Sequence, residues 1–352
     1  MVDSQILVET RQFERRAVVF DGDRPIGLFH ESELLPRGLR LGTVHAAVLL
    51  AQPSAFDGGF CKTQGGEDVY VRFAKGATPP LGQRLTVEIV AEAQGGKAAR
   101  GRPVAGERDD SEADPFQAWC NRVSEVIDVQ QAHGTDAQAR IDLAFEQALS
   151  REITLPGGGQ LRLARTPALT AVDIDTSGRV ERAGRSALAR AVNLEAAAET
   201  ARQLALRGLG GLVVLDCVAP VSKALGAEVK TAFLDAFRAV SPRRVAALAP
   251  SPFGLLEASL AWAERPIDEV FMDGSGQLSP QAQLLEGLRR LERDIEQRPA
   301  ASLTLALPEA AYIAIRPFMG SADRLAGEVS RRLGPNIQIE KSPHGRVEVI
   351  RR

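Results

Sequence analysis

The segment from Leu169 to Gly178 (LTAVDIDTSG) places two aspartates one residue apart in an otherwise apolar, β-branched run. In an extended strand successive side chains alternate between the two faces, so Asp173 and Asp175 project to one side while Val172 and Ile174 project to the other. A charged group is costly to bury without a partner, so the pair is expected to face water, a basic side chain or a cation. The segment is therefore a candidate metal site.

A third carboxylate follows the next strand-like segment. Residues 212–216 (LVVLD) end in Asp216, and the intervening LEAAAETARQLALRG predicts a long helix that Asn193 caps and that glycines end. Strand, helix and strand in this order predict a βαβ unit with two parallel strands and a right-handed crossover. All three aspartates are then expected at one edge of the sheet, where open α/β sheets usually bind their ligands.

The elements before this unit predict a hairpin and a small β-barrel. The first 35 residues contain apolar runs separated by polar, turn-like segments. Residues 41–93 form several short strand-like runs, a pattern typical of a five-stranded OB-type barrel, and such barrels often bind single-stranded nucleic acid on an aromatic face. Residues 95–115 are charged, rich in small residues and without a hydrophobic period, which predicts a linker.

The remaining segments predict an α/β layer followed by a small α+β domain. Ser279 and Pro280 are expected to open a helix with leucines on one face. Hydrophobic periodicity predicts these further elements: helices in 116–129, 138–149, 228–240 and 254–264, a hairpin in 152–176 that ends in the acidic strand, and a strand in 244–251.

Composition limits the class of protein. With 352 residues, 44% hydrophobic residues and 25% charged residues, the chain is long enough for two or three globular domains. A formal net charge of -2 argues against a uniformly basic nucleic-acid surface but leaves local basic patches open. The three cysteines are far apart and lack metal-ligand spacing, which favours a reducing compartment. The sequence also shows no leader-like start and no apolar run near 20 residues. Together these features predict a cytoplasmic protein with no membrane contact.

Three blocks of the sequence resemble the RNase E / RNase G endoribonuclease family. TAVDIDTSGR, NLEAAAETARQLALRGLGGLVVLD and PFGLLEASL are similar to family blocks that read roughly TAIDIN, NLEAA...IARQLRLRNLGGLIVIDFIDM and RFGLLEMSR. Their order and spacing agree with the family, and the long middle block is specific. The resemblance covers most of the chain.

The resemblance implies an α/β fold: an RNase H-like βαβ layer with an inserted S1/OB-type β-barrel, a DNase I-like α/β layer and a small C-terminal α+β domain. It implies six segments: an N-terminal hairpin joining the RNase H-like domain (1–35), the RNA-binding barrel (36–102), a linker (103–115), a shortened connecting region with the acidic strand (116–190), the α/β catalytic layer (191–275), and a helix with the C-terminal domain (276–352).

The resemblance also implies roles for the acidic residues. Asp173 and Asp216 fall on the two magnesium-binding aspartates of the family, and Asp175 falls on the asparagine that supports the first of them. Oxygen ligands suit Mg²⁺, which activates water and neutralises developing charge when a phosphodiester is hydrolysed. Asp175 is either a third ligand or an added negative charge. The alternative for the pair is a structural one, as strand-end caps or partners of nearby arginines.

Five residues are candidate RNA contacts. By the resemblance, Phe60 and Tyr70 lie near the S1 aromatics that pack against bases, although aromatics in a barrel are more often core, and Lys97 lies near a basic S1 residue. Arg179 and Arg182 belong to the loop between the acidic strand and the following helix. They either position phosphates or belong to a solvated loop.

The chain departs from the family pattern in four places. About 45 residues separate the barrel from residue 152, so the 5'-end-sensing segment has no counterpart. The zinc-link motif CPxC is replaced by AWAERPIDEVFMDG, so any homo-oligomer forms without a zinc-link. Ala219 stands in place of an acid and Pro252 in place of an arginine, which weakens the case for catalysis.

Two functions follow from these features. The first is an Mg²⁺-dependent endoribonuclease that cleaves single-stranded RNA independently of the 5' end. The second is a non-catalytic RNA-binding relative that kept the scaffold. Retention of Asp173 and Asp216 favours the enzyme, whereas Ala219 and Pro252 favour the binder.

Overall fold

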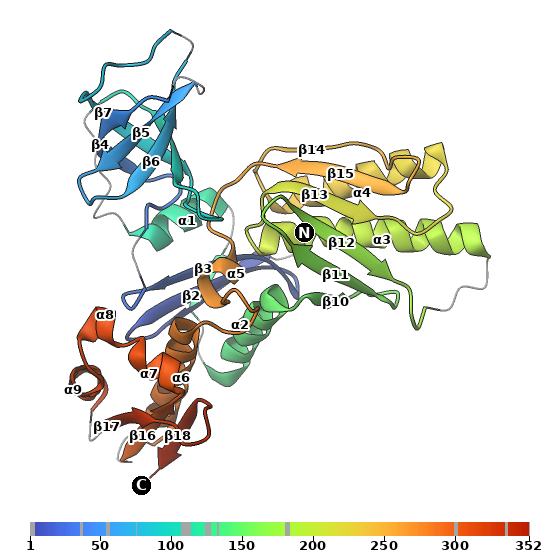
Figure 1. Ribbon diagram of the computed structural model, residues 1–352. Helices are drawn as coiled ribbons and strands as arrows, with labels where there is room; N and C mark the ends of the chain where they lie inside the picture. Colours follow the sequence, from blue (N-terminus) through green and yellow to red (C-terminus); the bar gives the residue numbers. More distant parts are fainter. Residues whose placement is uncertain are drawn as a thin grey trace.

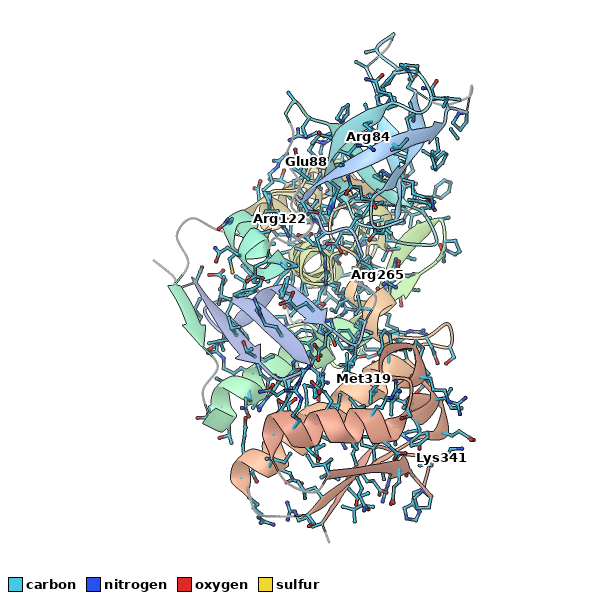
Figure 2. All side chains as sticks on the ribbon, turned by 90° about the vertical axis from the view of Figure 1, so that its left-hand side faces the viewer. Arg84, Glu88, Arg122, Arg265, Met319 and Lys341 are labelled. Atoms are coloured by element: carbon cyan, nitrogen blue, oxygen red, sulfur yellow. The ribbon has the colours of Figure 1, made fainter. Side chains whose placement is uncertain are left out.

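The computed structural model of the chain contains a β-barrel, an α/β sheet and a C-terminal α+β unit around a small N-terminal sheet (Figure 1). It describes residues 4–35, 38–53, 57–74, 76–106, 114–123, 128–131, 134–179, 184–298, 302–334 and 337–351. Figure 2 shows the barrel with Arg84 and Glu88 at one end of the molecule and the C-terminal unit with Met319 and Lys341 at the other.

The N-terminal strands form a meander rather than only a hairpin. β1 (Ser4–Thr10), β2 (Glu14–Asp21) and β3 (Arg24–Ser32) pair antiparallel, and β9 (Asp128–Gln131) adds parallel to β1. The single helix predicted over 116–129 is therefore wrong at its end. α1 (Pro115–Val123) stops, and the chain at Asp128 becomes a strand because the open edge of β1 offers backbone hydrogen bonds.

The predicted small barrel is confirmed. β4 (Val44–Ala51), β5 (Gly58–Thr63), β6 (Asp68–Arg72), β7 (Arg84–Ala91) and β8 (Ala99–Pro103) close in the order β4-β5-β6-β8-β7. Alternate side chains fill its own core, including Leu49, Val69 and Ile89. A Cβ at Gly101 on β8 would lie 2.2 Å from Cγ1 of Val87 on β7, so β8 can approach β7 this closely only with glycine at that position.

The acidic segments lie in a six-stranded mixed sheet. Its order is β10 (Glu152–Thr154), β11 (Gln160–Arg165), β12 (Leu169–Asp175), β13 (Gly211–Asp216), β15 (Leu255–Leu260) and β14 (Val245–Ala247). α3 (Arg185–Leu206) connects β12 to the parallel β13, which confirms the βαβ unit. The inward side chains of the strands share one core with α3 and with α4 (Lys223–Val240).

Two predictions within this unit are wrong. The expected helix over 254–264 is the strand β15, in which Leu256, Ala258 and Leu260 alternate with outward-facing residues. Its leucine, alanine and glutamate favour a helix locally, but pairing with β13 and β14 on both sides overrides that preference. Asn193 is not a helix cap, because α3 begins at Arg185 and Asn193 is fully buried within it.

The C-terminal region contains the expected helix and α+β unit. α6 (Pro280–Gln297) begins after Ser279, whose Oγ accepts a hydrogen bond of 3.2 Å from Ala282 N. β16 (Leu303–Leu307) lies between β17 (Ile337–Lys341) and β18 (Glu348–Arg351). The other helices are α2 (Gly134–Leu149), α5 (Ile267–Phe271), α7 (Glu309–Ile313), α8 (Arg316–Met319) and α9 (Ala322–Leu333).

Buried ion pairs join α6 to the N-terminal sheet. Glu14 lies 2.7 Å from Arg289 and 2.8 Å from Nε2 of His30. Glu9 pairs with Arg16 on the neighbouring strand and lies 3.0 Å from Arg293. Each carboxylate is almost inaccessible to water, and each is held both by groups of the N-terminal sheet and by an arginine from the far end of the chain.

Candidate active site

Asp173 and Asp216 lie side by side on neighbouring parallel strands. Val172 is opposite Leu215 in the register of β12 and β13, so the two aspartates directly follow this pair on strands about 4.8 Å apart. Val172 and Leu215 point into the core beneath α3 and α4. By alternation, both carboxylates occupy the opposite face of the sheet, and both are exposed.

An arginine that the sequence interpretation did not select lies beside the aspartates on the same sheet. Arg162 on β11 is opposite Asp173, and its Nη2 donates a hydrogen bond of 2.9 Å to Oδ2 of Asp175. Its Nε lies 3.5 Å from Glu152 on β10. The antiparallel register of β11 and β12 brings this side chain to the aspartates, and the hairpin predicted over 152–176 did not specify that register.

The carboxylate of Asp175 is already engaged. Its Oδ1 accepts a hydrogen bond of 2.8 Å from the backbone of Ser177, and hydrogen bonds from Ser177 lower its pKa, with a further contribution from the charge of Arg162. Across the described residues, no group of three or more His, Cys, Asp and Glu side chains is placed to hold a metal ion. The acidic site is thus a pair, Asp173 and Asp216, with Asp175 held beside it.

The loop after Asp216 is fixed by a buried amide. Nδ2 of Asn193 donates to the carbonyl of Val218 at 2.8 Å, and the N–H of Val218 donates to Oδ1 of Asn193 at 2.8 Å. The two bonds tie the chain two residues beyond Asp216 to the middle of α3. A polar residue on the alanine- and leucine-rich face of the helix was the sequence signal for such a role.

Phe60 and Tyr70 lie outside the barrel core. They are paired across β5 and β6 with ring centroids 5.3 Å apart, and Phe60 is 40% exposed. Arg100 continues the row on β8, opposite Tyr70. Two aromatic rings and a guanidinium therefore form one stripe on the outer surface of the barrel, with Phe60 and Arg100 exposed and Tyr70 half-buried.

Lys97 and Arg100 connect the barrel to the α/β sheet through Trp262. The Lys97 ammonium lies 4.9 Å and the Arg100 guanidinium 4.2 Å from the centroid of the Trp262 ring. A Cβ at Gly210 would lie 2.7 Å from Cδ1 of this ring, so the indole packs directly on the backbone that enters β13. The barrel thus contacts the end of β13 opposite to Asp216.

Arg179 is engaged within the protein. Its Nη1 lies 2.5 Å from Glu195 on α3 and 3.2 Å from the carbonyl of Gly158, and only 11% of the side chain is accessible. These contacts hold the β10–β11 turn against α3. Arg182 lies outside the described residues.

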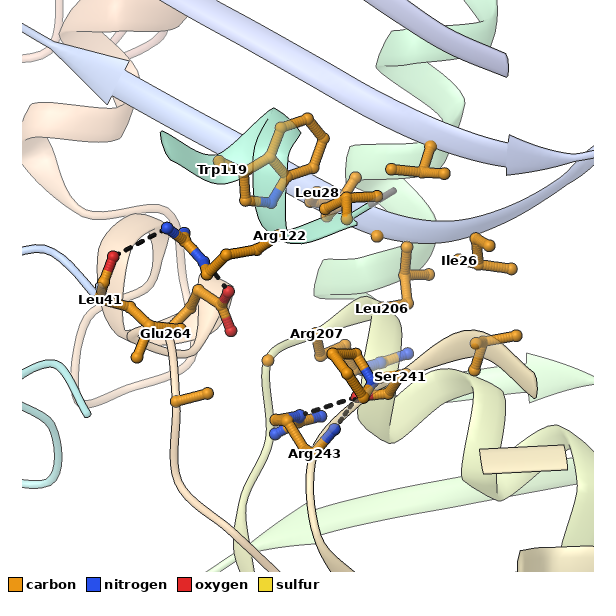
Figure 3. Close-up of a pocket in the computed structure, with 18 of the residues that line it drawn as sticks. Ile26, Leu28, Leu41, Trp119, Arg122, Leu206, Arg207, Ser241, Arg243 and Glu264 are labelled. Atoms are coloured by element: carbon orange, nitrogen blue, oxygen red, sulfur yellow. Dashed lines mark hydrogen bonds and ion pairs between the residues drawn. The ribbon is translucent and has the colours of Figure 1, made fainter. Parts of the chain in front are cut away.

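A cavity of about 970 Å³ lies away from the acidic edge, beside the ends of α3 and α4 (Figure 3). Trp119 and Leu28 form one wall, and Arg207 and Arg243 lie on the other. The Arg207 guanidinium donates to the carbonyls of Gln147 and Ser150, and burial lowers its pKa to about 10. Arg243 likewise donates to backbone carbonyls, so these arginines join chain segments.

A closed five-stranded barrel of this size is a fold that often binds oligonucleotides, and here it is joined to an α/β sheet with paired acids at a strand edge. Residues 111–260, which include β12, β13 and the acidic pair, match the family described as the Ribonuclease E/G family. The segment 111–260 thus carries the sequence pattern of the ribonuclease E/G family.

Individual ribonucleases show the same relationship. The chain is 41% identical over 120 residues to ribonuclease E of Haemophilus influenzae, which is 34% of this chain and 13% of that protein. Ribonuclease E of Escherichia coli is 41% identical over 121 residues, or 34% of this chain and 11% of that protein. Escherichia coli ribonuclease G is 36% identical over 91 residues, or 24% of this chain and 19% of that protein. The chain thus matches less than a fifth of each of these relatives.

In the described part of the chain, every helix is too short or too polar to span a lipid bilayer.

Proposed function

We propose that the chain is an Mg²⁺-dependent endoribonuclease that cleaves single-stranded RNA by phosphodiester hydrolysis, independently of the 5' end. The observation that carries the proposal is the position of Asp173 and Asp216, adjacent and exposed on parallel strands within the region that matches the family. Two unburied carboxylates on one face leave room for a cation and for the phosphate that it would meet.

The donor set fits magnesium. Mg²⁺ prefers oxygen ligands, keeps several waters and is usually held by one or two carboxylates together with substrate phosphate. Asp173 and Asp216 supply that number of carboxylates. The bound cation would activate a water molecule and neutralise charge on the phosphate. Arg162, half exposed and paired with Asp175, limits the net negative charge that an approaching RNA backbone meets.

The barrel would hold the RNA away from the site of cleavage. Phe60 and Tyr70 present aromatic surface on which bases can stack, and Arg100 adds a positive charge to the same stripe. Lys97, which contacts Trp262, contributes a further positive charge to RNA binding by the barrel. Within this proposal the barrel, residues 36–102, is an S1-type RNA-binding domain, and the sheet around Asp173 is the RNase H-like layer.

The division of the rest of the chain is part of the same proposal. Residues 1–35 join the RNase H-like domain, and 103–115 form the linker. Residues 116–190 are the shortened connecting region with the acidic strand, and 191–275 complete the RNase H/DNase I-like catalytic layer. Residues 276–352 are the helix and the small C-terminal domain.

Cleavage of a fluorescently labelled, unstructured RNA by the purified chain tests the proposal. We expect cleavage with Mg²⁺ that EDTA abolishes, and we expect Asp173→Asn and Asp216→Asn to eliminate it while RNA binding survives on the barrel. Asp235→Asn, at an exposed position on α4, is the matched control and should cleave normally. Cleavage by both site variants at the normal rate would refute the assignment of the site.

End dependence and assembly form separate tests. The RNA should be cleaved equally well with a 5'-monophosphate or a 5'-triphosphate, and a strong preference for the monophosphate would contradict end-independent cleavage. Any homo-oligomer should keep its mass in EDTA, and dissociation would reveal a metal contact between subunits.

A non-catalytic RNA-binding function is the second candidate. It is favoured by the engagement of Asp175 with Arg162 and Ser177, which leaves a pair rather than a triad of free acids in the described residues. Binding of RNA without cleavage across Mg²⁺ and Mn²⁺ titrations would establish this function. Ala219 and Pro252, both exposed beside the acidic edge, would then be the first positions to restore.

A further inference from the structure

An exposed aromatic side chain lies beside the acidic pair and is not used by the function proposed above. Phe253 is 87% exposed, more than any other large hydrophobic residue in the described part of the chain. It belongs to the turn between β14 and β15 and stands two residues before Leu255, which is opposite Asp216 in the sheet. The ring is therefore attached directly next to the carboxylate edge.

The backbone that carries Phe253 is held on several sides. Gly254 N donates to the carbonyl of Ser251 at 2.9 Å, and Ser251 N donates to the carbonyl of Leu255 at 3.0 Å. The turn is tied to the active-site loop because Cys217 N donates to the carbonyl of Gly254 at 3.0 Å. A fixed turn that presents an aromatic ring to water stabilises no core, so the exposed ring requires another explanation.

Packing against α4 adds to this rigidity. A Cβ at Gly226, in the first turn of α4, would lie 3.3 Å from Cδ of Pro250, so helix and turn are in close contact. Ser222 caps the same helix by accepting a hydrogen bond of 3.1 Å from Leu225 N. The amino end of α4, with Lys223, and the amino end of α3, with Arg185, thus lie at the edge that carries Asp216, and both favour phosphate nearby.

We propose that Phe253 stacks on the nucleobase next to the phosphate that lies at Asp173 and Asp216. The inference rests on the proposed ribonuclease function and extends it by naming the residue that orients the RNA at the site of cleavage. Acidic side chains repel the RNA backbone, so a contact on the base adds a hold on the strand that this repulsion does not weaken. An aromatic ring accepts any base, which agrees with a single-stranded substrate.

Kinetics of four variants test the contact. Loss of one base–aromatic stack corresponds to about 5- to 150-fold, so kcat/KM of Phe253→Ala should fall by at least about 5-fold. Phe253→Trp should stay within about 2-fold, and Phe253→Leu should resemble the alanine variant because it lacks a π-face. Leu212→Ala is the matched control, since Leu212 is 57% exposed at the opposite end of β13 and should change nothing.

A second readout does not depend on cleavage. RNAs with 2-aminopurine at one position each are bound to the Asp173→Asn protein, with and without the additional Phe253→Ala change. We expect one position to be quenched by stacking and to regain its fluorescence, by about 2-fold or more, when the ring is removed. Equal fluorescence at every position, or leucine acting as well as phenylalanine, would overturn the inference.

The two hypotheses fail in distinguishable ways. If the unaltered protein binds RNA but does not cleave it, the ribonuclease proposal fails while the 2-aminopurine signal still decides the role of Phe253. If Phe253→Ala instead changes the mass of the protein in solution, the ring belongs to a protein contact and the base-stacking role is refuted.

Discussion

Asn193 connects the middle of α3 to the loop that follows Asp216, and its replacement should be costly. Asn193→Leu keeps a side chain of similar volume but removes both hydrogen bonds to Val218. A buried N–H or C=O left without a partner costs about 1–3 kcal/mol. Because Val218 is only half-buried, water can reach part of the loop, and we expect a total loss of about 2–4 kcal/mol in the free energy of unfolding.

Urea denaturation followed by circular dichroism measures this loss, with an unchanged m-value showing that the unfolded states are comparable. Arg190→Ala on the same helix is the control, because it removes only an exposed ion pair with Glu228 and should cost less than about 1 kcal/mol. A loss below about 0.5 kcal/mol for Asn193→Leu would show that the loop satisfies Val218 by other means and would refute the reasoning.

Three further results are expected. Burial raises the pKa of Glu292 to about 7 from an unfolded value of 4.5, so between these pH values the folded state holds a proton that the unfolded state releases. The free energy of unfolding should therefore fall as pH rises through this range. Urea denaturation of Glu292→Gln should show a flatter dependence on pH. Arg289→Met leaves Glu14 without its arginine, so thermal or urea unfolding should show a loss of about 3–5 kcal/mol, and a loss below about 1 would mean that His30 alone suffices. Trp262→Ala removes the ring that Lys97 and Arg100 contact, so the barrel should be held less firmly against the α/β sheet. Small-angle scattering should then show a larger radius of gyration. An unchanged radius would mean that the backbone hydrogen bond from Glu92 N to Ala263 O holds the barrel in place.

The acidic pair was predictable because its position depends on local rules. Alternation within β12 decides the face of Asp173, and the helix between the strands makes them parallel, so Asp216 follows on the next strand. The barrel was predictable for a similar reason, since short strands with turn residues between them have few other arrangements. No comparable rule places Arg162, whose distance from Asp175 depends on the pairing of β11.

The errors have a common origin in tertiary contacts. β15 contains residues that favour a helix, and it is a strand because β13 needs a partner on its second side. Asn193 is of a residue type that commonly caps helices, yet its partner lies 25 residues away at Val218. The exposure of Phe253 was not predictable either, because it depends on the three-dimensional path of the turn between β14 and β15.

The ion pairs between α6 and the N-terminal sheet have a consequence for the order of folding during synthesis. Arg289 follows Glu14 by 275 residues and Arg293 follows Glu9 by 284 residues. At about 5–20 residues per second, a ribosome needs roughly 15–60 s to translate that distance. The barrel carries a complete core of its own and can close as soon as it leaves the exit tunnel. The sheet that precedes it in the chain can pair Glu9 with Arg11 and Arg16 at once, whereas Glu14 has to wait for Arg289, so the first strands made complete their buried ion pairs late.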